Sequence, residues 1–398
     1  MKILVANLGS TSYKYTLFNA TATGLDAVAK GKYERVEDHG LVIEHSLQAL
    51  IDEGHLASLD ELAAVGFKTV MGGDVTGCRL ADDTVLEALE RTAPLAPAHN
   101  PPYAAGIRQF ARLAPKATHV VLFETAFYQW VAPVAKRYAV PQAWYEAGVR
   151  RYGFHGASHK FIAERSAELL GRADIVERVQ SLYAGKPEEL PAFEGQPLRV
   201  ISCHLGGSSS VTAIRNGTAI GTSMGFSPQS GLPQNNRVGD LDAMAIPFAL
   251  RQLGLSLDEV DRQLTKQSGL LGVSGLSNDI RDLKDAAAQG HADAQTALDL
   301  LNHEIRRWAS SFLFDLNGLD AIAFTGGIGE FNPDVRAAVC RSLEFLGLEL
   351  DAAANEACLG AEAVISTAAS KVKVLVIPAN EEAVIATETQ RFLQRRKH

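Results

Sequence analysis

Three short segments of the chain combine glycine with hydroxyl side chains or further glycines in a way that suits phosphate binding. They are residues 9–12 (GSTS), 206–210 (GGSSS) and 326–329 (GGIG). Glycine lets the backbone come close to an anion, while hydroxyl and backbone N–H groups donate hydrogen bonds to its oxygens. One such turn usually only reverses the chain. Three of them in one chain predict a ligand with several phosphates.

Two common phosphate-binding motifs are missing from the sequence. Neither GxxxxGK[ST] nor GxGxxG occurs in the 398 residues. A P-loop and the usual dinucleotide-binding turn therefore lose their main support. Another arrangement of elements has to present the three loops.

The first two loops lie at the centre of two segments with the same plan. Residues 2–20 and 199–219 each contain an apolar run, a turn and a second run of β-forming residues, which predicts a β-hairpin. Aligned without gaps, NATA at residues 19–22 falls on NGTA at residues 216–219. This match indicates an internal duplication, with chance similarity between two hairpins as the alternative.

The rest of the chain alternates between helical and strand patterns. Residues 83–92, 158–170 and 294–316 have helical periodicity, and residues 117–123 form a buried-strand pattern. These patterns predict an α/β class. The glycine- and proline-rich stretch 184–197 predicts a loop. Because 398 residues exceed what one core usually supports, we expect two domains with a cleft between them.

Composition narrows the classes of partner. A formal net charge of −8 argues against nucleic acid, which needs a basic surface. Hydrophobic residues make up 46% and charged residues 21%, as in ordinary globular proteins, and no apolar stretch approaches the roughly 20 residues that span a membrane. Four cysteines without a CxxC spacing, and no signal peptide, favour a reduced, cytoplasmic protein.

Segments spread over the whole chain resemble the acetate kinase family. Two hairpins with phosphate-binding turns that face each other across a cleft are typical of the wider actin, hexokinase and Hsp70 superfamily. RRYGFHGASHK with SGLLGVSGLSNDIRDL is the most specific pair. The matching segments are NLGSTSYK (7–14), APAHNPP (96–102), FETAF (123–127), RRYGFHGASHK (150–160), HLGGSSS (204–210), TSMGFSP (222–228), RVGDLD (237–242), SGLLGVSGLSNDIRDL (268–283), FTGGIGE (324–330) and IPANEE (377–382).

The resemblance implies a duplicated ribonuclease H-like α/β fold with two actin-like domains and a central cleft. We expect residues 1–127 with 383–398 to form one domain and residues 128–382 the other. It also implies reversible transfer of the ATP γ-phosphoryl group to the carboxylate of a short-chain acid, giving an acyl phosphate and ADP. Mg²⁺, or Mn²⁺ in its place, would be the metal, and the partners would be the acid, the nucleotide and a second copy in a homodimer.

The same resemblance supplies candidates for the chemistry. Arg237 has a planar guanidinium that suits the phosphoryl group or the carboxylate. His155 would donate a hydrogen bond to the phosphoryl group in flight. Glu381, with Asn7, would hold the metal, since Mg²⁺ prefers oxygen ligands and keeps several waters. Glu124 is the second carboxylate candidate, and Glu124 and Asn7 complete the catalytic set.

Further residues are assigned to binding by their place in the matching segments. The acid would be bound by Lys68, Val70, His99, Pro228 and Arg237. The phosphates and the nucleotide would be bound by Ser10, Ser12, Lys14, His204, Gly206, Gly207, Ser208, Asn278, Asp279, Ile280, Arg281, Gly327, Ile328 and Gly329.

The chain departs from the family pattern at several of these positions. Lys68 stands where the family has a carboxylate-binding arginine, and Phe67 and Met71 stand where it has histidines. Lysine keeps the charge but loses the bidentate fork. We therefore expect weak acetate kinase activity and a preference for another small carboxylic acid, with Phe67 and Met71 adding apolar surface to the acid site. Glu124 replaces an aspartate, and Gly207 begins a changed phosphate loop.

Three functions fit these observations. The first is an ATP-dependent kinase for acetate, propionate or a related acid. The second is a kinase of the same fold that uses pyrophosphate or a different acceptor. The third is a non-catalytic ligand sensor, against which the retention of Arg237, His155 and Glu381 argues.

Overall fold

The structure is a computed structural model that describes residues 1–21, 24–184, 190 and 192–396. Within these residues the strands form two sheets of six. The order in the first sheet is β3 (Leu25–Glu34), β2 (Ser12–Ala20), β1 (Lys2–Leu8), β4 (Leu62–Thr69), β6 (Thr118–Phe123) and β5 (Cys78–Leu80). The order in the second sheet is β9 (Thr218–Thr222), β8 (Ser209–Arg215), β7 (Arg199–Leu205), β10 (Ala321–Thr325), β12 (Lys373–Val376) and β11 (Ala363–Val364).

The two sheets have the same topology. In each, three antiparallel strands come first, two further strands add in parallel, and the last strand is antiparallel. The duplicated fold and the α/β class predicted from the sequence are confirmed. The predicted strand at residues 117–123 is β6, and the two hairpins are β1–β2 and β7–β8.

The ungapped match between the two hairpins is wrong beyond the turns. Leu8 pairs with Tyr13, whereas Leu205 pairs with Ser209, so the second turn is one residue shorter. Asn19 lies inside β2, but Asn216 lies in the turn between β8 and β9, where its φ is 53°. The duplicated unit is therefore preserved in strand order but not residue by residue.

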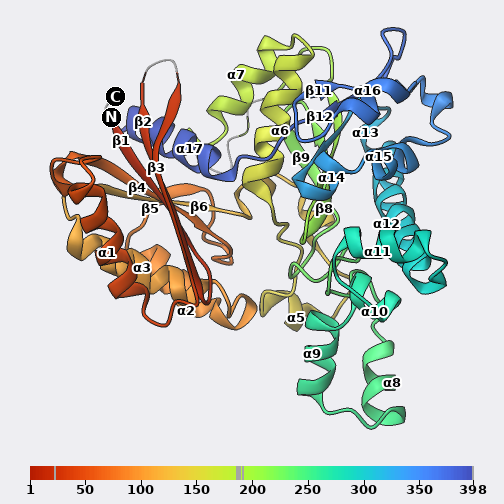
Figure 1. The fold of residues 1–398 in the computed structure, drawn as a ribbon, viewed down its shortest axis with the longest axis horizontal. Helices are drawn as coiled ribbons and strands as arrows, with labels where there is room; N and C mark the ends of the chain where they lie inside the picture. The colour runs from red at the N-terminus through yellow and green to blue at the C-terminus, as the bar shows by residue number, and fades with distance from the viewer. Residues whose placement is uncertain (22–23, 185–189, 191, 397–398) are drawn as a thin grey trace.

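Helices cover both faces of each sheet (Figure 1). On the first sheet, α3 (Asn100–Leu113) contacts β1, β4 and β6, and α17 (Glu381–Arg395) contacts the same strands. Alternation along β4 sends the Phe67 ring toward Phe110 of α3, with centroids 5.5 Å apart. Gly66 faces α17, where a Cβ atom would lie 2.6 Å from Thr389 Oγ1. Glycine at position 66 thus permits the close approach of the C-terminal helix.

Most of the predicted helices are present. Residues 83–92 form α2 (Asp83–Arg91) and residues 158–170 form α6 (Gly156–Leu169). A single helix over 294–316 is wrong, because α12 (Ala292–Ser311) ends before Phe312 and α13 (Leu313–Leu316) follows. The Phe312 ring packs near Trp308 and under Gly221 of β9, and its N–H bonds three residues back rather than four. Packing against the sheet has overridden the helical periodicity.

The predicted loop at 184–197 has no helix or strand in its described part, and residues 185–189 and 191 lie outside the described residues. No helix in the described ranges is long and apolar enough to cross a membrane. The other helices are α1 (His39–Asp52), α4 (Pro133–Lys136), α5 (Gln142–Glu146), α7 (Ala173–Ser181), α8 (Ala245–Gln252), α9 (Leu257–Lys266), α10 (Gly269–Ser274), α11 (Ile280–Ala288), α14 (Gly326–Phe331), α15 (Pro333–Cys340) and α16 (Ala352–Ala357), with 3₁₀ turns at Leu59–Glu61, Ala93–Leu95, Ala126–Tyr128 and Glu344–Leu346.

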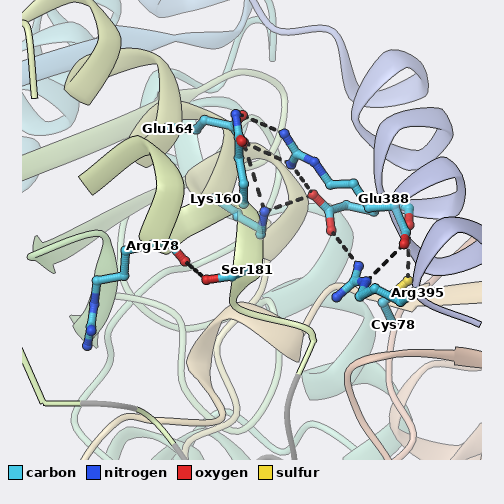
Figure 2. Close-up of polar contacts among 9 residues, drawn as sticks. Cys78, Lys160, Glu164, Arg178, Ser181, Glu388 and Arg395 are labelled. Atoms are coloured by element: carbon cyan, nitrogen blue, oxygen red, sulfur yellow. Dashed lines mark hydrogen bonds and ion pairs between the residues drawn. The ribbon is translucent and has the colours of Figure 1, made fainter. Parts of the chain in front are cut away.

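A buried group of charged side chains joins α6 to α17 (Figure 2). Lys160 Nζ donates to Glu388 Oε1 at 2.8 Å, and the two side chains are only 1% and 2% exposed. Arg391 bridges Glu388 and Glu164, at 2.7 and 2.6 Å. The first residue of α17 is Glu381, and α6 begins directly after His155. The charged group therefore fixes two helices whose N-terminal ends carry predicted site residues.

Candidate active site

Two cavities lie at the carboxyl ends of the parallel strands. The central cavity has a volume of about 350 Å³ and draws residues from both halves of the chain. The outer cavity has a volume of about 600 Å³. The central cavity is lined by Asn7, Leu8, Gly9, Ser12, Lys14, Lys68, Val70, His99, Tyr103, Glu124, Phe154, His155, Ser208, Pro228 and Arg237. The outer cavity is lined by Gly206, Gly207, Asn235, Asp279, Ile280, Arg281, Gly327, Ile328, Phe331 and Asn332.

The turn between β7 and β8 separates the two cavities. Gly206 and Gly207 line the outer cavity, and the next residue, Ser208, lines the central one. In the same way Asn235 lines the outer cavity and Arg237 the central one. Ligands of open α/β sheets bind where parallel strands end, because loops and free backbone groups gather there. A long ligand in the outer cavity can therefore reach the central cavity along this turn.

A lysine and two carboxylates meet on one side of the central cavity. Lys68 Nζ lies 2.6 Å from Glu381 Oε2 and 3.6 Å from Glu124 Oε1. Burial alone would lower the pKa of Lys68, but the two carboxylates raise it well above its ordinary value. Burial raises the pKa of Glu124, while Lys68 lowers that of Glu381. At neutral pH the lysine carries its charge between the two acids.

This corner of the cavity fits a divalent cation. Both carboxylate oxygens of Glu124 are buried and have no hydrogen-bond partner within the described residues, and Lys68 contacts only Oε1, at an ion-pair distance of 3.6 Å. A buried carboxylate with unmade hydrogen bonds is costly, and a bound cation would relieve that cost. Asn7 Oδ1, at the end of β1, accepts a hydrogen bond from Tyr103 at 3.0 Å. The described chain has no cluster of three or more His, Cys, Asp or Glu that could hold a metal. Mg²⁺ needs only one or two carboxylates with waters, so Glu124 and Glu381 suit it.

Two neutral imidazoles lie together, with His155 lining the central cavity and His204 behind it. The rings of His155 and His204 have centroids 4.3 Å apart. Burial, reinforced for His155 by the neighbouring histidines and cations, lowers the pKa of both, to about 4 for His204. His155 caps α6 in the left-handed region at φ 60°, and its side chain makes no capping hydrogen bond to the helix. The pair can donate hydrogen bonds without carrying charge.

Arg237 reaches the central cavity from the loop before α8. Its Nη1 donates to Ser208 Oγ at 3.2 Å and to Gln234 Oε1 at 3.3 Å, and burial lowers its pKa. Gly269 lets this loop pack, since a Cβ atom there would lie 2.0 Å from Gln234 O. Burial, together with Arg237 and Lys68, also lowers the pKa of His99 at the start of α3. The Arg237 guanidinium therefore faces a site whose nearby histidines are uncharged.

Most residues that line the two cavities are among the predicted site residues, but not every predicted site residue lines a cavity. Ser10 and Asn278 are exposed and line neither cavity, and His204 lies behind the wall. Gly329 is packed against Leu205 and Phe324 instead of facing the outer cavity. Glu381 reaches the site through its ion pair with Lys68.

Phe67 and Met71 do not add apolar surface to the acid site, so that prediction is wrong. Phe67 faces α3 because it alternates with Lys68 along β4, and Met71 packs with Tyr152, Phe154 and Met224. Seven lining residues were not predicted as site residues. They are Leu8, Gly9, Tyr103, Phe154, Asn235, Phe331 and Asn332. Leu8, Gly9 and Phe154 stand inside matching segments, which was a signal that could have found them. For the other four the only available signal was that each lies within a few residues of a predicted one.

The chain is similar to known proteins over nearly its whole length. The model of the Acetokinase family matches residues 27–387. The acetate kinase of Natranaerobius thermophilus is 41% identical over 420 aligned positions, covering 99% of this chain and 100% of that protein. The crystal structure of Porphyromonas gingivalis acetate kinase has a TM-score of 0.87 at 33% identity, covering 98% and 99% of the two chains. A propionate kinase from Francisella tularensis gives 0.81 at 31% identity, covering 97% and 98%.

Proposed function

This chain belongs to the acetokinase family, and from that membership we propose that it transfers the γ-phosphoryl group of ATP reversibly to a short-chain carboxylic acid. The observation that carries the proposal is the shared turn. Gly206 and Gly207 face a cavity of about 600 Å³, large enough for a nucleotide, and Ser208 faces the cavity that holds the charged side chains. The size of the outer cavity favours a nucleotide over pyrophosphate as the donor.

The acid would lie in the central cavity, with its carboxylate toward Arg237 and its apolar part against Val70, Phe154 and Pro228. A carboxylate oxygen attacks the γ-phosphorus, the bond from that phosphorus to the β-phosphate oxygen breaks, and ADP leaves with the electron pair. The products are an acyl phosphate and ADP. A propionate kinase among the similar structures supports the class of acid.

The charge that develops on the phosphoryl oxygens would be met by donors from both walls. Arg237 supplies a guanidinium, His155 supplies a neutral N–H, and Ser12 and Lys14 supply donors from the first hairpin. Glu381 and Glu124, with Asn7, would hold Mg²⁺ or Mn²⁺, which when bound neutralises charge on the phosphates. Asp279, Ile280, Arg281, Gly327 and Ile328 would surround the nucleoside.

We also propose the division of the chain expected from the sequence, 1–127 with 383–398 and 128–382. The packing of α17 on the first sheet supports it. A homodimer acting in a reducing compartment is proposed on the resemblance and on four buried free cysteines. Light scattering coupled to size exclusion tests the dimer.

Calorimetry tests the nucleotide site. A Cβ atom built on Gly327 meets nothing within 4 Å, so a side chain there would enter the outer cavity without disturbing the core. We expect Mg·ATP to bind the native chain and to be lost in Gly327→Leu, with an unchanged melting temperature. Binding of pyrophosphate but not of Mg·ATP would contradict the proposal.

A further inference from the structure

Behind His155, three buried side chains form a hydrogen-bonded chain that ends in the core. Ser210 Oγ lies 2.8 Å from His155 Nδ1 and 2.8 Å from His159 Nε2. His159 Nδ1 in turn lies 2.8 Å from Ser202 Oγ. Ser202, His159 and Ser210 are all 0% exposed. The order is therefore Ser202, His159, Ser210, His155 and then the central cavity.

Ser202, at the buried end of this series of hydrogen bonds, determines the direction of every hydrogen bond in the series. Within the described part of the protein, the Ser202 hydroxyl has no hydrogen-bond partner other than His159. If Ser202 accepted from His159, its own proton would be buried without an acceptor, which is unfavourable. Ser202 therefore donates to His159 Nδ1. A neutral imidazole has one N–H, so His159 donates through Nε2 to Ser210, and Ser210 donates to His155 Nδ1.

We propose that Ser202, His159 and Ser210 are positioning residues that hold His155 as the Nε2–H tautomer, with its N–H available to the central cavity. This inference rests on the proposed function for its consequence, because a phosphoryl oxygen needs a donor from His155. The opposite direction would present a lone pair to the phosphoryl oxygens and repel them. The tautomer of His155 would thus be determined by the buried Ser202, acting through His159 and Ser210, and not by groups at the cavity wall.

A second imidazole is held in the same way. Ser158 Oγ lies 2.9 Å from His204 Nδ1, and this hydroxyl has no other partner among the residues described. Ser158 is buried in the first turn of α6, so the same argument makes it the donor. His204 then also carries its proton on Nε2, the nitrogen that lies near Gly206 at the shared turn. Both histidines would present N–H groups on the side where phosphates are expected.

The direct test is the tautomer of His155 in the native protein. Histidine-selective ¹⁵N labelling with long-range ¹H–¹⁵N correlation distinguishes the two tautomers, and a His155→Gln sample assigns the signal. We expect the Nε2–H form. In Ser202→Ala and in Ser210→Ala we expect a mixture with Nδ1–H. A native Nδ1–H signal, or an unchanged tautomer in both variants, would overturn the proposal.

Kinetics supply the second readout. Ser202→Ala should lower kcat about 10- to 100-fold and leave KM for the acid nearly unchanged, as expected for a residue that acts through another. Ser202→Thr, which keeps the hydroxyl, should recover most of the rate. Ser166→Ala is the matched control, because this buried serine of α6 has no hydrogen-bond partner in the described structure, and its rate should be unchanged. The tautomer is measured without turnover. A failed kinase assay would therefore refute the proposed function, but not the proposal that Ser202, His159 and Ser210 hold the tautomer of His155.

Discussion

Lys68 Nζ lies 2.6 Å from Glu381 Oε2, although 313 positions separate the two residues in the sequence. The contact joins the end of β4 to the first turn of α17 at the edge of the central cavity. A lysine in this position is already bound by two carboxylates, so it contributes less to holding a substrate than an unpaired cation would. In the proposed function, Arg237 would be the main group that orients the acid.

The first prediction concerns the identity of the acid. Lysine acts as a point charge and lacks the fork that fixes the plane of a carboxylate. We expect an acid other than acetate to have the highest kcat/KM in a panel of short-chain, hydroxy- and substituted acids. Lys68→Arg should shift the ranking toward acetate. If acetate is already the best substrate of the native enzyme, the prediction is contradicted, and lysine in place of the family's arginine at position 68 does not change the specificity.

The second prediction concerns the metal. Glu124→Gln and Glu381→Gln should each raise the Mg²⁺ concentration for half-maximal activity about tenfold or more, because each removes an anionic oxygen ligand. Glu382→Gln is the matched control, since this neighbouring carboxylate accepts from Thr16 and does not line the cavity. Titration of activity with Mg²⁺ measures the effect. Equal Mg²⁺ requirements in all three variants would exclude both glutamates as ligands.

The third prediction concerns the buried pair between α6 and α17. Lys160→Met takes one of two charged hydrogen-bond donors from the buried Glu388 carboxylate, which keeps its bond to Arg391, and should cost about 1–3 kcal/mol of unfolding free energy. The double variant Lys160→Met, Glu388→Met removes both charges and should recover most of that loss. Urea denaturation followed by circular dichroism compares them. A double variant as unstable as the single one would contradict this prediction. It would show that the pair does more for stability than neutralise two buried charges.

The fourth prediction concerns acid stability. Burial alone would raise the pKa of Glu164, but its hydrogen bond to Arg391 and the charge of Lys160 lower it below the ordinary 4.5. A depressed pKa stabilises the folded state above the unfolded value, and the contribution is lost as the pH falls through the folded one. Glu164→Gln should therefore lower the unfolding free energy by the full contribution of Glu164 at pH 6, and by progressively less below about pH 4.5. An exposed control, Glu37→Gln, should show no such trend.

The sequence predicted the parts of the site that depend on local chain properties. The turns at residues 9–12 and 206–210 follow from glycine and serine between β-forming runs, and they do lie at strand ends. His155 and Arg237 stand in matching segments, whereas Lys68 and Val70 stand at positions where residues 66–73 depart from the family pattern. The structure brings all four to one cavity.

The remaining features depend on distant contacts. The one-residue difference between the two hairpin turns is a matter of pairing register, which neither turn specifies alone. Phe67 lies on the opposite face of β4 from Lys68, against Phe110, because side chains alternate along a strand. The series of hydrogen bonds behind His155 joins α6 to β7 and β8. A serine in a strand does not by itself indicate, in a single sequence, that it is part of such a series.

In the proposed reaction, the chain makes an acyl phosphate from ATP and a carboxylic acid at Arg237 and His155. Hydroxylamine traps an acyl phosphate as a hydroxamate, so the rate can be measured with Mg·ATP and each acid of the panel. We expect hydroxamate formation by the native protein, and a loss of about 10²–10³ in kcat for Arg237→Ala and for His155→Ala with the fold intact. Activity of both variants within a few-fold of the native enzyme, or no hydroxamate with any acid, would contradict the account.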